Sequence, residues 1–164
     1  MSNPNLLLAI AHDLALDRRW APLLDRAAAL FVAVGLTACL VLWRLPGVAA
    51  SASALHGAAA WLGAVAVQPL VEETLFRGLL QGQLLRTRFG SRLVGGISAA
   101  NLSASAAFVA AHFVHHTPQW ALATLPPSLA LGWLRERRDS TWAPIAVHAA
   151  FNLEFFATAA AFAR

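Results

Sequence analysis

The sequence contains no lysine, no tyrosine and a single cysteine among its 164 residues. One cysteine cannot form an internal disulfide or a cluster of cysteine metal ligands, which excludes those classes of protein. Charged residues make up 12% of the chain, against roughly 25% in an ordinary globular domain, whereas hydrophobic residues make up 59%. The pattern HExxH is absent, and the aspartates lie outside the apolar runs. A metalloprotease of the HExxH type and an intramembrane aspartyl protease are therefore excluded as well.

The positive charges are all arginines, and they occur in small clusters between apolar stretches. This distribution is typical of membrane topology rather than of a phosphate-binding stripe, so we expect no nucleic-acid partner. Apolar stretches of about 17 to 25 residues are long enough to cross a bilayer as helices. The predicted spans are 27–43, 53–85, 97–114, 119–134 and 142–162.

These runs predict an all-α fold, a polytopic transmembrane helical bundle of about five spans. Residues 1–26 combine Leu-rich patches with charges, which predicts an amphipathic N-terminal helix at the membrane interface. We expect a single intramembrane domain over 1–164, with its core motifs in 68–155. Arginines are concentrated on one side of the predicted spans. The prediction is therefore a multi-pass protein of the cell inner (plasma) membrane, with its N-terminus cytoplasmic and its C-terminus outside.

Ionisable side chains within apolar runs are functional candidates, because a charge in the hydrocarbon core is costly. They fall into three groups, which are Gln68, Glu72, Glu73 and Arg77; His112, His115 and His116; and His148, Asn152 and Glu154. Glu73 and Arg77 are four residues apart on a helix, a spacing that predicts a buried ion pair. Glu72 is five residues from Arg77, which leaves it freer to meet other helices. His148 and Asn152 again share one helix face.

These groups are sufficient for hydrolysis of a peptide bond without a covalent intermediate. A carboxylate such as Glu72 in apolar surroundings is suited to take a proton from water, and His112 can share that water. His148 and Asn152 offer hydrogen-bond donors for the oxyanion of a tetrahedral intermediate. Two alternatives stay open. One is a zinc-dependent protease with His112, His115 and Glu72 as ligands, and the other is a non-catalytic membrane scaffold or transporter.

Three segments carry a family resemblance: Glu72 to Gly78, Phe108 to His112, and His148 to Asn152. In this order they resemble the three motifs of the CPBP family, the CAAX protease and bacteriocin-processing (ABI) family of glutamic-type intramembrane endopeptidases. The resemblance implies that Glu72 activates water together with His112, and that His148 and Asn152 form the oxyanion site. It also implies supporting roles for Glu73, Arg77 and Phe108.

The chain is shorter than the larger members of that family. Its size is similar to compact members paired with C-terminal sorting signals of exported bacterial proteins, such as the JDVT-CTERM and MYXO-CTERM systems. The resemblance implies a hydrolase acting on a membrane-anchored protein or peptide, cut near its C-terminal membrane anchor or sorting signal, with the lipid bilayer as its surroundings. No cofactor is expected, and zinc enters only in the alternative mechanism.

Overall fold

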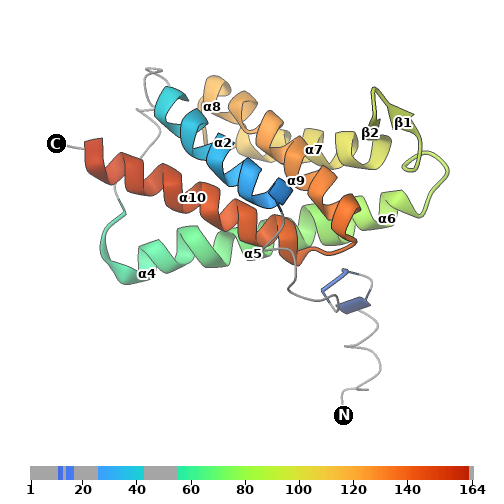
Figure 1. Ribbon diagram of the computed structural model, residues 1–164, viewed down its shortest axis with the longest axis horizontal. Coiled ribbons are helices and arrows are strands. Elements are labelled where there is room, and N and C mark those ends of the chain that lie inside the picture. Colours follow the sequence, from blue (N-terminus) through green and yellow to red (C-terminus); the bar gives the residue numbers. More distant parts are fainter. Residues whose placement is uncertain (1–10, 13, 17–25, 43–54, 163–164) are drawn as a thin grey trace, which may run out of the picture.

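The computed structural model describes residues 11–12, 14–16, 26–42 and 55–162, and most of these are helical, as the apolar runs predict. In chain order the elements are α2 (Arg26–Leu42), α4 (Gly57–Leu62), η2 (Gly63–Val67), α5 (Gln68–Glu73), η3 (Thr74–Gln81), α6 (Gly82–Leu85), β1 (Leu93–Val94), β2 (Ile97–Ser98), α7 (Ala99–His112), α8 (Pro118–Ala123), α9 (Leu125–Arg138) and α10 (Trp142–Phe162). The long helix α10 runs along the molecule, with α2, α9 and α5 packed against it (Figure 1).

Residues 57–85 form one run of consecutive helical segments in which α-helix alternates with the π-helical segments η2 and η3. The residues at the junctions have right-handed helical φ and ψ, so the run is continuous. Pro69 directly follows the start of α5 and has no N–H, which removes one α-helical hydrogen bond to the preceding turn. π-helical turns occur frequently at functional sites. This run carries Glu72, Glu73 and Arg77.

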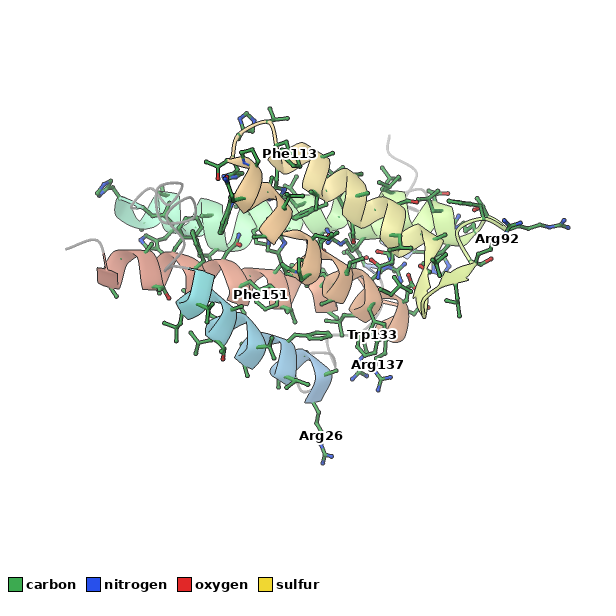
Figure 2. The ribbon with its side chains drawn as sticks, turned by 90° about the horizontal axis from the view of Figure 1, so that it is seen from above. Arg26, Arg92, Phe113, Trp133, Arg137 and Phe151 are labelled. Carbon is green, nitrogen blue, oxygen red and sulfur yellow. The ribbon has the colours of Figure 1, made fainter. Side chains whose placement is uncertain are left out.

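The apolar core lies between α9, α10 and α2. Its buried members are Ala28, Leu131, Leu134, Ala143 and Val147, with Phe31, Val32 and Phe151 packed around them. Phe151 of α10 lies against Gly35 of α2, where a side chain larger than hydrogen would collide with its ring (Figure 2). Gly35 therefore lets α2 approach α10 closely.

A short antiparallel hairpin precedes α7, which the sequence did not predict. Leu93 pairs with Ser98 and Val94 with Ile97. Gly95 and Gly96 form its two-residue turn with φ values of 61° and 84°, a conformation that glycine adopts without strain. These residues therefore make a tight turn before α7, so the helix begins only at Ala99.

The predicted five-span transmembrane bundle is wrong. Among the described residues, no helix has both the length and the apolar character that a membrane crossing requires. The predicted run 97–114 is shared between the hairpin and the 14-residue α7. The run 119–134 is divided at Thr124, because α9 starts anew with Pro126 in its first turn, where the missing N–H costs no hydrogen bond. The predicted orientation of the termini was derived from those spans and loses its basis.

The predicted amphipathic segment 1–26 lies mostly outside the described residues. Its described part is held by the start of α10. Thr141 Oγ1 donates a hydrogen bond to the carbonyl of Leu14, and the indole nitrogen of Trp142 donates to the carbonyl of Leu16 at 2.8 Å. The extension of the single domain over the whole chain stays a prediction.

A buried polar network connects η3, the hairpin and α9. Gln81 donates from Nε2 to Glu136 Oε1 at 2.7 Å and to the Gly132 carbonyl at 2.9 Å. Ser98 donates from Oγ to the same Glu136 oxygen at 2.5 Å. Because buried polar groups need partners, this network fixes how η3 lies against α9.

Candidate active site

Glu73, Arg77 and His148 form the charged centre of the molecule. The side chains of Glu73 and Arg77 are fully buried, and Arg77 Nη1 lies 3.2 Å from Glu73 Oε1. The ion pair predicted from their spacing is thereby confirmed. His148, which reaches in from α10, donates from Nδ1 to the same Glu73 oxygen at 2.7 Å. One carboxylate therefore holds both a guanidinium from its own helical run and an imidazole from another helix.

Arg77 is fixed on its other side by α9. Its Nη2 donates to Ser128 Oγ at 2.8 Å and to the Ser128 carbonyl at 3.1 Å. The guanidinium carbon also lies 4.6 Å from the ring centre of Phe108, a cation–π contact. Sequence reasoning missed Ser128, because nothing in local spacing connects it with a residue 51 positions earlier. Phe108 was predicted to support the site, and it touches the site residue Arg77 directly.

We expect Ser128→Ala to lower the free energy of unfolding by about 1–3 kcal/mol, because a hydrogen bond to a buried charge is lost while the backbone carbonyl remains. Equilibrium unfolding of the purified protein measures this. Ser91→Ala is the matched control, since Ser91 is exposed and makes only a local contact. Equal stability of the two variants would contradict the anchoring role of Ser128.

Glu72 is in a different environment from its neighbour Glu73. Gln68, one turn earlier, donates from Nε2 to Glu72 Oε1 at 2.8 Å. The second oxygen, Oε2, is buried and has no hydrogen-bond partner among the described residues. It lies 3.8 Å from His148 Nε2, and the Glu72 side chain as a whole is 22% exposed. Glu72 thus keeps one carboxylate oxygen without a described hydrogen-bond partner beside an imidazole.

The two contacts of His148 define the role of each ring nitrogen. A carboxylate oxygen accepts hydrogen bonds, so the bond to Glu73 places a proton on Nδ1. The other nitrogen, Nε2, then faces Glu72. The separation of 3.8 Å is too long for a direct hydrogen bond, but one water molecule can contact both atoms. His148 therefore lies between the two glutamates, with a separate contact to each.

His112 stands at the end of α7 next to Phe108. Its Nδ1 lies 2.9 Å from the Phe108 carbonyl, and the two ring centres are 4.4 Å apart. Phe108 in turn lies 6.0 Å from the ring of His148 and 5.2 Å from that of Phe76. His112 is thus connected through Phe108 to the ring of His148 and to the guanidinium of Arg77.

The remaining histidines of this turn differ in their surroundings. His115 is exposed, while His116 stacks on His112 with ring centres 5.5 Å apart. Burial lowers the pKa of His116, His112 and His115 lower it further, and Glu72 acts in the opposite direction. The lowered pKa favours the uncharged form of the His116 ring. Sequence reasoning listed His116 among the ionisable candidates but gave it no role in the reaction.

Asn152 lies one turn beyond His148 on α10, as its spacing predicts. Its Nδ2 donates to the Ala64 carbonyl at 2.8 Å, which ties α10 to the π-helical segment η2. A side-chain amide has two N–H groups, so one remains after this bond. Glu154 lies farther along α10 against Gly35 of α2, and no described contact joins it to the other candidates.

The described residues do not gather three or more His, Cys, Asp or Glu side chains in an arrangement that could hold a metal ion. The ligands of the zinc alternative would be His112, His115 and Glu72. Of these, His115 is exposed in the turn after α7.

The fold and the site define a helical protein with a centre of glutamate and histidine side chains. Hydrolases use such groups to activate water. The family model of type II CAAX prenyl endopeptidases, Rce1-like, matches residues 54–153. Because the match covers more than half of the chain, the protein belongs to this family, and the predicted membership of the CAAX protease family is confirmed. No curated protein and no solved structure matches the chain.

Family membership makes the protein a CAAX-type intramembrane endopeptidase in general terms, that is, a protease and hydrolase, and indicates a membrane location. The matched region contains every predicted site residue, from Glu72 to Asn152.

Proposed function

We propose that the protein is a glutamic-type endopeptidase of the plasma membrane that cuts a protein substrate near its C-terminal membrane anchor or sorting signal. The family name supports a cut near a C-terminus, because CAAX denotes a C-terminal sequence that carries a lipid anchor. The proposed partners are a membrane-anchored protein or peptide and the lipid bilayer. The proposed chemistry uses no cofactor.

The observation that supports this mechanism best is the difference between the two adjacent glutamates. Glu73 is fully buried and is bonded to Arg77 and His148. Glu72 keeps a buried Oε2 without a described hydrogen-bond partner, 3.8 Å from His148 Nε2. Glu73 Oε2 has no described hydrogen-bond partner either, but the Glu73 side chain is fully buried, whereas that of Glu72 is 22% exposed. A general base must reach the water from which it takes a proton, and Glu72 is the more accessible of the two glutamates. Glu73 is therefore assigned to positioning and Glu72 to catalysis.

The proposed reaction begins when Glu72 takes a proton from a water that it shares with His112. The resulting hydroxide attacks the scissile carbonyl carbon and forms a tetrahedral intermediate with a negatively charged oxygen. Protonated Glu72 then gives its proton to the leaving nitrogen as the C–N bond breaks. The products are a carboxylic acid and an amine, which become a carboxylate and an ammonium group when the acid gives its proton to the amine, and Glu72 returns to its starting charge.

The oxyanion is assigned to His148 and Asn152, which lie on one face of α10. Glu73 holds the Nδ1 proton of His148, so Nε2 donates to an oxyanion when the ring is protonated. Asn152 offers its second N–H, since the first is bonded to the Ala64 carbonyl. Arg77 and Phe108 support this arrangement by fixing Glu73 and by lining the rings.

The test is cleavage of co-expressed, C-terminally tagged proteins with membrane-anchored tails, with and without a strong chelator. We expect wild type to release the tag equally in both conditions, and His112→Ala to lose this activity. His115→Ala is the matched control and should cleave like wild type, because the proposed reaction does not use His115.

Two other results would overturn the proposal. Cleavage that is lost with the chelator and in His115→Ala would indicate the zinc mechanism. No cleavage of any tail by a folded wild type would favour the scaffold or transporter.

A further inference from the structure

His112 has only one hydrogen bond among the described contacts of its ring, the one from Nδ1 to the Phe108 carbonyl. A carbonyl oxygen only accepts, so this bond puts the proton on Nδ1 and leaves Nε2 as the acceptor in the neutral ring. A single hydrogen bond does not by itself prevent the ring from turning about its side-chain bonds, because terminal torsions of histidine have broad minima. Something else must keep the ring in this orientation.

Two other rings lie against the His112 ring. Phe108 lies on it with centres 4.4 Å apart and planes 39° apart. His116 lies on it with centres 5.5 Å apart and planes only 20° apart, a stacked geometry. Such offset contacts between flat rings restrict rotation and contribute up to about 1.5 kcal/mol each.

His116 is itself held in place by two other elements. Its backbone N–H donates to the His112 carbonyl at 3.0 Å, which continues the last turn of α7. Its ring lies 5.9 Å from that of Trp120 on α8, and Trp120 lies 4.6 Å from Phe155 on α10. Figure 2 shows the turn after α7, where Phe113 marks its position at the edge of the molecule. A chain of rings thus connects His112 through His116 to α8 and α10.

We propose that His116 is a positioning residue, whose flat ring clamps His112 against Phe108 and fixes the Nδ1–H form of His112. This inference rests on the proposed function for its effect on catalysis. The structural part of the proposal, that His116 fixes the orientation of the His112 ring, does not depend on any activity. Burial and the neighbouring histidines lower the pKa of His116, which favours an uncharged ring stacked on His112.

The first measurement is nitrogen NMR of the full-length protein labelled at histidine, in which the two neutral forms of an imidazole have different chemical shifts. We expect His112 to be in the Nδ1–H form in wild type and in His116→Phe, and in a mixture of both forms in His116→Ala. His115→Ala is the matched control from the same turn and should resemble wild type. A single Nδ1–H form in His116→Ala would overturn the proposal.

The second measurement is cleavage of the tagged substrate. We expect His116→Ala to lower kcat about tenfold with KM nearly unchanged, since misplacing a catalytic group slows the chemical step more than binding. His116→Phe should restore most of the rate because it keeps a flat ring. If His116→Phe does not restore the rate, the proposed clamp is wrong and the His116 imidazole itself takes part in the reaction.

A third variant separates folding from positioning. If His116→Ala does not fold, His116→Leu fills the space with an apolar side chain that is not flat, and the proposal requires it to behave unlike Phe in the NMR measurement. If no variant and no wild type cleaves any substrate, the proposed function fails while the NMR result still decides whether His116 fixes His112.

Discussion

Glu72→Gln is expected to lower cleavage of the tagged substrate by about 10²- to 10⁴-fold, the range associated with loss of a general base. Glutamine keeps the size of the side chain and can still accept the hydrogen bond from Gln68 at Oε1. It cannot take a proton from water, so the reaction loses its first step. The free energy of unfolding should stay close to that of wild type, because Glu72 has no ion pair with Arg77.

Glu136→Gln is the matched control for Glu72→Gln. Glu136 is also partly buried, and its Oε1 accepts bonds from Gln81 and Ser98 that a glutamine oxygen can accept as well. It lies in the network between η3 and α9, away from His148, so cleavage should remain near the wild-type rate. Full activity of Glu72→Gln, or an equal loss in both variants, would remove Glu72 from the role of base.

The pairing of Glu73 with Arg77 shows what local spacing can predict. Residues four apart on a helix share a face whatever the rest of the fold does, and these two are fully buried together. The partners that other helices contribute to Glu73 and Arg77 could not be predicted from local spacing. Ser128 binds Arg77 from α9, and His148 binds Glu73 from α10, contacts that depend on how the helices pack. The sequence predicted His148 as an oxyanion donor but not its bond to Glu73.

Helix content was predictable from apolar runs, but helix length was not. The run 142–162 corresponds to α10 and the run 27–43 nearly to α2. The run 97–114 contains no charge that would stop a helix, yet a hairpin at Gly95 and Gly96 shortens it. Apolar composition alone does not predict where such a turn begins. The same limit applies to Thr124, where α8 ends and α9 begins.

Arg77→Ala is expected to lower the free energy of unfolding by about 3–5 kcal/mol, the cost of removing one partner of a buried ion pair. The change leaves the buried Glu73 with His148 as its remaining described partner, deprives Ser128 of its bond and removes the cation over Phe108. Unfolding by denaturant or heat measures this effect. Arg77→Lys keeps the positive charge without the planar fork of donors, so its loss of stability should be smaller but still clear.

The matched control is Arg137→Ala. Arg137 also has its guanidinium over an aromatic ring, 5.1 Å from the centre of Trp133, but it is exposed on α9 (Figure 2). Its removal should change stability by less than about 1 kcal/mol. The double variant Glu73→Gln with Arg77→Leu should be less destabilised than the sum of its single changes, because it leaves no unpaired buried charge. A stably folded Arg77→Ala that does not cleave would instead show that Arg77 acts in the reaction, since positioning through the ion pair requires the loss of stability.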